Sequence, residues 1–460
     1  MKASRGWMVL GAALALAVGV TRPVGSFSID AGAFLDSPVL LGLTKDLHLG
    51  EPVHELITST AVRHVTDDVS TRLVRHIVRG NENADGPTHK FDNVYHVNNA
   101  NTSNGAFRDS FELIRMLVDA AVTDARDNDE FWNPRHDTFQ GILDDIADTL
   151  FALGLNAGCN LVGESACPQA QLLARAAVAR ADSLRLLVNP MPDPHGAEKD
   201  MLLNLRADLR TLLDPPREKA FCRPLTTHCF GRLDALLPDN EAFQADVRRL
   251  RRLEAEARAY FAWQNLGHAF HATQDFFAHA NFVELLNDRN GPPCGSRGRP
   301  AICGEPLGGE PERTDPKLLP FLRELRAGFA LNVKTLQTSL GTKFPRLQTG
   351  FVDSVPHLSL TFCQETLPAG FDYCHWGYKD VPGLNKDVAA EADKEPSHLN
   401  HAYARKVAQY ASEILWEDFL RRADLLPAAP TDSKREALKR AKLARQRALR
   451  ALIPVLMDDE

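Results

Sequence analysis

Apolar residues recur at spacings of three and four along most of the chain, which is the pattern of amphipathic helices. The helices that this spacing predicts cover residues 52–79, 108–126, 138–155, 169–188, 199–214, about 240–287 and 397–422. Gly80 is expected to end the first helix, and Ser397 to cap the last. The best strand signal is residues 351–363, and the Gly-, Pro- and Arg-rich residues 288–320 predict a loop. We therefore predict an all-α fold.

The N-terminus has the composition of an export signal. Lys2 and Arg5 precede an uninterrupted apolar run over residues 7–20, which is short for a membrane span. Small residues before Phe27 suit cleavage, so we predict a signal peptide over residues 1–26. The alternative is an uncleaved N-terminal anchor. With cleavage, the mature protein would be secreted or periplasmic.

The eight cysteines fall into four pairs of near neighbours, which suits an exported chain. The pairs are Cys159 with Cys167, Cys222 with Cys229, Cys294 with Cys303, and Cys363 with Cys374. An even count in an exported protein predicts disulfides, here closing short loops. Connectivity stays open, because eight cysteines allow about 105 pairings.

Charge divides the chain into an acidic body and a basic tail. Loss of residues 1–26 removes three basic residues and no acidic one, so the net charge goes from −7 to −10. Residues 433–452 carry eight Lys or Arg and one Glu. We therefore predict one helical domain over residues 27–425, with an insertion at about 130–250, and a basic amphipathic tail over 426–460. The tail could lie on an anionic membrane or be a solvated helix packed by its leucines.

Candidate chemistry is concentrated in the stretch HAFHATQDFFAHANFVEL. Each helical residue turns about 100°, so His268, His271, Asp275 and His279 fall within about 80° of one another. Phenylalanines occupy the other sides of this helix, which predicts burial nearly all round. Buried titratable groups must be paired or bound to a metal. The spacing therefore suits zinc ligands on successive turns, and the alternative is a structural ladder of His–Asp hydrogen bonds.

One helix cannot complete a metal site, so further ligands must come from other segments. The candidates are His54 at the start of a predicted helix, Asp85, His89, Asp92 and His96 in a polar loop, and His398 and His401 one helical turn apart.

Taken in order, these residues resemble the zinc-dependent phospholipase C family, whose all-helical fold is shared with the zinc single-strand nucleases. The resemblance lies in the succession of His54, Asp85, His96, the His271–Asp275–His279 motif and a late helical histidine. The stretches LGHAFHATQDFFAHANFVEL and CHWGYKDVPGLNKD are more similar to the heterokaryon-incompatibility C family and its bacterial relatives. The resemblance covers scattered motifs over residues 52–416, and the insertion at 130–250 has no counterpart in it.

The resemblance implies a ligand set for one to three zinc ions. One ion would be held by Asp85, His96, His271 and Asp275. A second would be bridged by Asp275 and bound by His54, and a third bound by His279 with His401 or His398.

The chain departs from the family's pattern of zinc ligands in two places. The family's zinc-binding Trp at the mature N-terminus has no counterpart here, because no Trp follows the predicted cleavage site until Trp132. Arg405 stands where a carboxylate would complete the third site. Two residues have further expected roles. Asp85 would also serve as the general base. His268 would orient a ligand or contact phosphate, and the alternative is a core histidine whose hydrogen bonds are made within the protein.

We therefore expect a secreted, zinc-dependent phosphodiester hydrolase acting on phospholipid, with the basic tail as a membrane contact. The alternatives are a recognition or toxicity factor that keeps the metal scaffold with little catalysis, a zinc nuclease, and a structural zinc protein. Nucleic acid is the less expected substrate, because the acidic body does not favour a polyanion.

Overall fold

The structure is a computed structural model. It describes residues 53–66, 69–85, 92–156, 241–287, 307, 310–331, 333–354, 361–362, 367–375, 383–384, 386 and 399–425. These residues are mostly helical, which confirms the all-α prediction. Outside them lie the predicted signal peptide, the predicted helices at 169–188 and 199–214, the basic tail, and every cysteine except Cys374.

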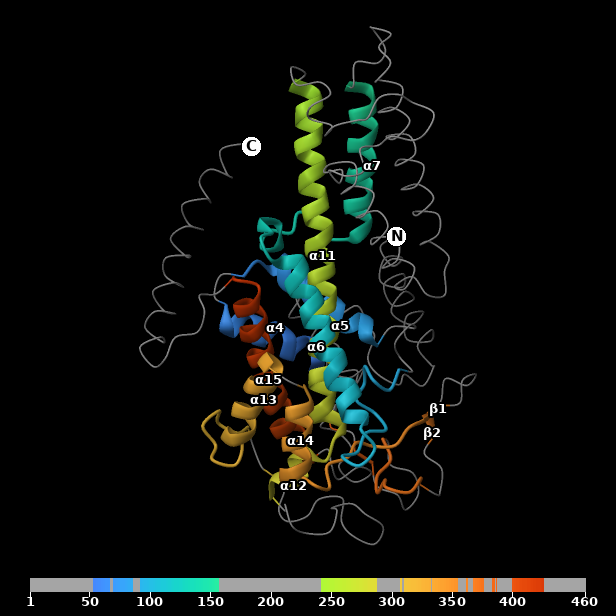
Figure 1. The fold of residues 1–460 in the computed structure, drawn as a ribbon, viewed down its shortest axis with the longest axis vertical. Coiled ribbons are helices and arrows are strands. Elements are labelled where there is room, and N and C mark those ends of the chain that lie inside the picture. The colour runs from blue at the N-terminus through green and yellow to red at the C-terminus, as the bar shows by residue number, and fades with distance from the viewer. Residues whose placement is uncertain are drawn as a thin grey trace, which may run out of the picture.

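The long helix α11 (Glu241–His279) runs through the centre of the described structure (Figure 1). The helices packed against it are α4 (Val53–Val65), α5 (Thr71–Ala84), α6 (Ala106–Ala125), α7 (Phe139–Asn156) and α15 (His401–Arg422). In Figure 1, α7 lies beside the upper half of α11, and α6 crosses the lower half. Within the described residues, no helix is both long enough and apolar enough to cross a membrane.

Residues 52–79 do not form one helix, and Gly80 does not end it, so both predictions were wrong. The segment divides into α4 and α5, and the Ser70 side chain caps α5 by accepting a hydrogen bond from the Leu73 amide at 3.1 Å. Gly80 lies inside α5 because α11 passes close by: a Cβ there would be 2.8 Å from the Gln264 carbonyl oxygen. This close crossing brings the C-terminal end of α5 against the middle of α11.

The predicted helix over residues 240–287 is also interrupted. It forms α11 and the short α12 (Phe282–Asn287), separated at Ala280 and Asn281. Asn281 donates its amide N–H to the Gln348 carbonyl at 3.0 Å, and its side-chain oxygen accepts from the Gln348 amide at 2.9 Å. Because these bonds replace helical ones, α11 ends at His279, beside the segment that contains Gln348.

The C-terminal third contains elements that the periodicity did not predict. Helices α13 (Leu319–Leu331) and α14 (Val333–Lys343) pack against each other, and α13 also packs on α15. The predicted strand at 351–363 is instead a two-residue antiparallel pair, β1 (Asp353–Ser354) with β2 (Thr361–Phe362). Earlier in the chain, between α6 and α7, a short 3-10 helix, η1 (Asp129–Phe131), also packs against α11. Helix α15 begins at His401, with Asn400 as its N-cap.

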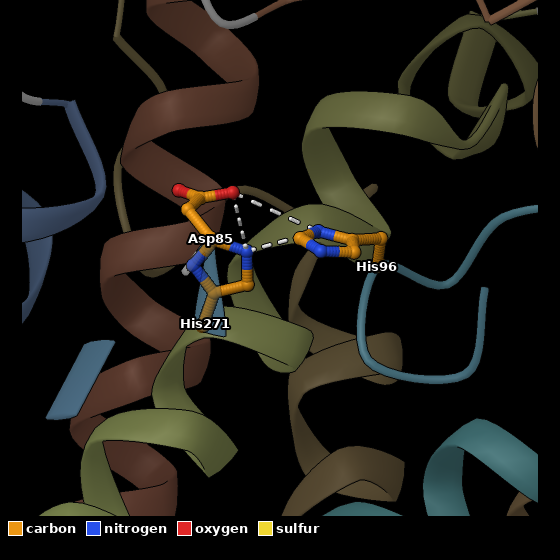
Figure 2. A group of neighbouring side chains, drawn as sticks. All are labelled: Asp85, His96 and His271. Atoms are coloured by element: carbon orange, nitrogen blue, oxygen red, sulfur yellow. Dashed lines mark hydrogen bonds and ion pairs between the residues drawn. The ribbon is translucent and has the colours of Figure 1, made fainter. Parts of the chain in front are cut away.

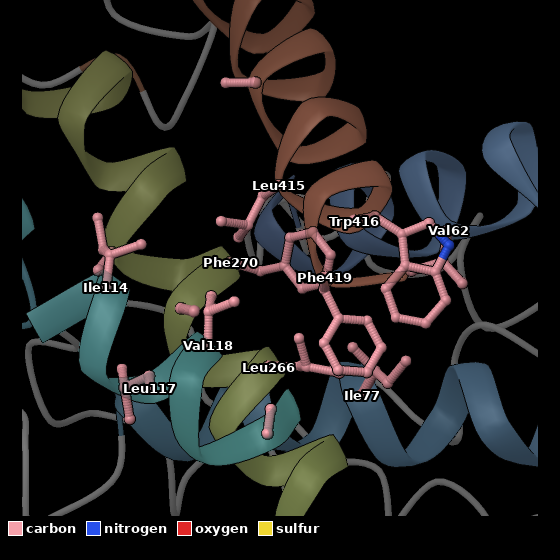
Figure 3. Packing of buried hydrophobic residues seen from close by; sticks show 14 of the residues in the cluster. Val62, Ile77, Ile114, Leu117, Val118, Leu266, Phe270, Leu415, Trp416 and Phe419 are labelled. Carbon is pink, nitrogen blue, oxygen red and sulfur yellow. The ribbon is translucent and has the colours of Figure 1, made fainter. Parts of the chain in front are cut away.

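The core surrounds α11 and seals the region where the candidate ligands lie. Leu266 and Phe270 of α11 have Trp416 and Phe419 of α15 on one side and Val118 of α6 on the other (Figure 3). All five side chains are at most 1% exposed. The helix is therefore buried nearly all round near its C-terminal end, as the sequence predicted. A polar group on this stretch must find its partner inside the protein.

Candidate metal centre

Four separate segments contribute polar side chains to one buried cluster. His54 stands in the first turn of α4, Asp85 is the C-cap of α5, His96 lies in the following loop, and His271 and Asp275 lie on α11. Among these, His271 and Asp275 are 1% exposed, His96 6% and Asp85 8%. The fold therefore brings these predicted ligands together, away from solvent.

The loop that carries His96 is tied to the end of α11. Ala100 and Thr349 exchange hydrogen bonds: the Thr349 amide donates to the Ala100 carbonyl at 2.7 Å, and the Ala100 amide donates to Thr349 Oγ1 at 2.8 Å. Thr349 is bridged in turn to Ala280, one residue past α11. These contacts place His96 over the last turns of α11, where Asp275 lies.

Asp275 is the centre of the cluster. Its Oδ2 lies 2.9 Å from His96 Nδ1, 3.2 Å from His271 Nε2 and 3.8 Å from His279 Nδ1. Its Oδ1 lies 3.2 Å from His54 Nε2. The two oxygens of one carboxylate therefore face different imidazoles, an arrangement that lets a carboxylate bridge two cations.

Asp85, His96 and His271 bring one ligand atom each to the same place (Figure 2). Asp85 Oδ1 is 3.9 Å from His96 Nδ1 and 3.7 Å from His271 Nε2, and the two nitrogens are 3.2 Å apart. Ligand atoms around a tetrahedral zinc ion, with bonds of about 2.0–2.1 Å, are separated by about 3.3 Å. The spacing of these atoms therefore fits a single small cation between them.

The hydrogen bonds behind the cluster show which imidazole nitrogens face it as lone pairs. His54 Nδ1 is 3.0 Å from Gln274 Oε1, and His271 Nδ1 is 3.1 Å from Asn81 Oδ1. Amide oxygens only accept, so both Nδ1 atoms carry hydrogen, and whenever either ring is neutral its lone pair is on Nε2. Those Nε2 atoms point at oxygens of Asp275. A lone pair facing a carboxylate is repulsive unless a proton or a cation lies between them.

Two carboxylate oxygens in the cluster accept no hydrogen bond from any residue that the structure describes. Asp85 Oδ1 and Asp275 Oδ1 are fully buried, and no donor among the described residues lies within hydrogen-bond geometry of either. Burying an anionic oxygen without a partner costs several kcal/mol, about 3 or more. Together with the Nε2 lone pairs, these oxygens form a set of electron-pair donors that a metal cation would satisfy.

The charge states are set by burial and by the partners. Burial opposes ionisation of Asp275, but the charges of His271 and His279 and hydrogen bonds from His271 and His96 hold its pKa well below the usual value. Burial lowers the pKa of His271, yet the charges of Asp275 and Asp85 outweigh it and the pKa is raised. Next to the cluster, burial raises the pKa of Glu55 to about 7. The cluster therefore keeps a negative centre that attracts cations.

The other candidates lie around this cluster in different positions. His279 packs edge-on against His375, with ring centroids 4.1 Å apart, and His401 Nδ1 donates to the Lys386 carbonyl at 2.5 Å. His268 is half-buried, and its ring lies edge-on against Tyr95 at 5.7 Å. His398 lies outside the described residues.

Sequence reasoning missed the amide side chains that hold the histidines. Asn81 and Gln274 are buried beside the ligands, and neither stood out by residue type or periodicity. The available signal was Gln274 next to Asp275, since two adjacent polar residues are unusual in a stretch whose phenylalanines predict burial nearly all round. His375, which was not among the predicted ligands, also contacts His279 directly.

We compared the chain with protein-family models, with curated proteins and with solved structures. None matched. What bears on function is therefore the geometry of the candidate metal centre, together with the sequence resemblance.

Proposed function

We propose that this protein is an exported, zinc-dependent phosphodiester hydrolase of the phospholipase C type. The observation that supports it best is the convergence of Asp85, His96 and His271 on one point beside Asp275. Two imidazole nitrogens with two carboxylates form a ligand set that zinc favours.

Asp275 gives the proposed centre room for more than one ion. Its Oδ1 faces His54 and its Oδ2 faces His96 and His271, so the carboxylate can bridge two cations. His279, with His401 or His398, would hold a third, as the resemblance implies. We therefore propose one to three zinc ions per chain.

Bound zinc would neutralise phosphate charge and lower the pKa of a water ligand toward about 7. Asp85 would hold the ion through Oδ1, which faces His96 and His271, so its other carboxylate oxygen would take the proton of the attacking water. The water oxygen would form a new bond to phosphorus while the bond to the ester oxygen breaks. The departing oxygen would receive the proton that Asp85 took from the water, so the products would be a phosphomonoester and an alcohol. Asp275, kept anionic, holds the histidine ligands in place.

Phospholipid is the proposed substrate, on the strength of the sequence resemblance and the basic tail. Nucleic acid is the second phosphodiester to test. A different class of function has its own support: the side chains of the central ligands are at most 12% exposed, which limits access for a bulky substrate. That burial favours a recognition or toxicity factor with a metal-held scaffold.

Hydrolysis assays on zinc-loaded protein separate these functions. The substrates are phosphatidylcholine vesicles, single-stranded DNA and bis(4-nitrophenyl) phosphate, and the variant is Asp85→Asn. Asp124→Asn is the matched control, because Asp124 is also a buried aspartate but lies on α6, away from the cluster. We expect release of the phosphorylated headgroup, reduced at least 100-fold in Asp85→Asn and retained in Asp124→Asn. Zinc-loaded protein that cleaves none of the three substrates would favour the scaffold function.

A further inference from the structure

A buried amide pair lies directly behind the metal centre. Asn81 of α5 and Gln274 of α11 are 0% and 1% exposed, and Asn81 Nδ2 donates to Gln274 Oε1 at 3.2 Å. Each amide oxygen also accepts from a candidate ligand, Gln274 from His54 and Asn81 from His271. One connected network therefore supports ligands from two different helices.

Two hydroxyl groups fix the direction of both amides. Thr58 Oγ1 accepts from Asn81 Nδ2 and from Gln274 Nε2, each at 2.8 Å, and Ser412 Oγ accepts from Gln274 Nε2 at 3.3 Å. If either amide were rotated by 180°, its NH₂ group would face an imidazole N–H, and the hydrogen bonds that it donates to the hydroxyls would be lost. With these contacts made, the amide oxygens face the imidazoles.

We infer that Asn81 and Gln274 are positioning residues, which hold His271 and His54 in the Nδ1–H tautomer and so direct both Nε2 atoms to the metal. The inference rests on the proposed metal-dependent function, since it explains how the chain prepares its ligands. Groups that orient metal-binding histidines in this way typically change metal affinity by about 10–100-fold when removed.

The network also couples the two ligands. Gln274 Oε1 accepts from both His54 and Asn81, and Asn81 in turn holds His271. His54 faces Oδ1 of Asp275 and His271 faces Oδ2. Loss of Gln274 should therefore disturb the ligands on both sides of the bridging carboxylate.

The chain contains a matched control for this role. Asn83 Nδ2 donates to Gln264 Oε1 at 2.7 Å, so a second Asn–Gln pair joins the same two helices. Both residues are half-buried, and the backbone of Gln264 lies at the crossing of α5 and α11, where Gly80 approaches it. If the amide pairs only connect the two helices, substitution in either pair should have the same effect on zinc affinity and on the imidazole tautomers.

The test compares Gln274→Met with Gln264→Met, and with Gln274→Glu as the conservative variant. Met has the length of Gln but no acceptor oxygen, whereas Glu keeps an acceptor for His54, and the hydroxyls of Thr58 and Ser412 can rotate to donate to it. Zinc affinity is measured by competition with a chromophoric chelator. Imidazole tautomers are measured by ¹⁵N NMR of the metal-free protein.

We expect Gln274→Met to bind zinc 10–100-fold more weakly than wild type and to lose an Nδ1–H imidazole signal. Gln274→Glu and Gln264→Met should stay within about threefold of wild type and keep the signal. If Gln274→Met does not fold, Asn81→Leu removes the acceptor of His271 and gives the same comparison. Equal zinc affinity and unchanged tautomers in Gln274→Met would overturn the inference. Absence of zinc binding by wild type would instead refute the proposed function, while the tautomers of the metal-free protein still test the amide pair.

Discussion

The crossing of α5 and α11 gives a sharp prediction for Gly267→Ala. Gly267 lies on α11 where α5 passes, and a Cβ there would be 2.3 Å from the Gly80 carbonyl carbon and 2.4 Å from Asn81 N and Ile77 O. These are backbone atoms, so no flexible side chain can move aside. The helices would have to separate by about 1 Å to restore ordinary van der Waals contact.

The expected cost follows from two opposed terms. Overpacking of this kind destabilises by about 1–3 kcal/mol, and the upper end applies because two backbones must move. The better helix propensity of alanine returns about 1 kcal/mol. We therefore expect a net loss of about 2 kcal/mol for Gly267→Ala. Separation of the helices would also move Asn81 and Asp85 away from His271, so zinc affinity should fall as well.

Gly341→Ala is the control, because Gly341 lies in α14 and, among the residues that the structure describes, a Cβ there would meet only Thr102 atoms at 3.9 and 4.0 Å. This variant should be stabilised by up to about 1 kcal/mol. Urea unfolding followed by circular dichroism, with and without zinc, measures both. If Gly267→Ala were as stable as Gly341→Ala, the close crossing would not exist as described.

Three further predictions concern stability. At a zinc concentration 100 times the dissociation constant, bound zinc should raise the unfolding free energy of wild type by about 2.7 kcal/mol. The unfolding free energy of Asp275→Ala should not rise, and thermal unfolding with and without EDTA measures both. Burial lowers the pKa of His76 from 6.5 to about 4, so its contribution to the free energy of unfolding is lost as pH falls through that range. Between pH 7 and pH 4, the unfolding free energy of His76→Gln, measured by urea unfolding, should therefore fall by about 3 kcal/mol less than that of wild type. Trp416→Ala should cost about 3–5 kcal/mol in the same assay, because the side chain is fully buried; a loss below about 1 kcal/mol would contradict the packing.

The sequence predicted best what regular helix geometry determines. His271, Asp275 and His279 recur every four residues, so their common face follows from the helical repeat, and the structure places both histidines beside Oδ2 of Asp275. His268 shares that face by angle but lies seven residues before Asp275, about 10.5 Å along the axis. That distance explains why its ring packs on Tyr95.

The features that sequence could not predict depend on contacts between distant segments. Gly80 was predicted to end a helix, whereas it lies inside α5, where the lack of a side chain lets α11 approach closely. The break after His279 depends on Asn281 pairing with Gln348, sixty-seven positions away. The roles of Asn81 and Gln274 depend on four helices meeting, and neither residue type signals that role alone.

The approach of His54, Asp85 and His96 to α11 was expected because one helix cannot complete a metal site and because of the order of motifs in the resemblance. The structure brings all three to within 4 Å of an atom of His271 or Asp275. Their use as metal ligands is the proposal that ties the fold to function.

The most direct test of that proposal is the zinc content of the purified protein. Wild type, Asp275→Ala and Asp124→Asn would be prepared without chelators and measured by elemental mass spectrometry. We predict one to three zinc ions per chain in wild type and in Asp124→Asn, and at least one fewer in Asp275→Ala. Folded wild-type protein that contains no metal and takes up none, with Asp275→Ala indistinguishable from it, would show that the cluster is a structural hydrogen-bond ladder and would contradict the metal-dependent function.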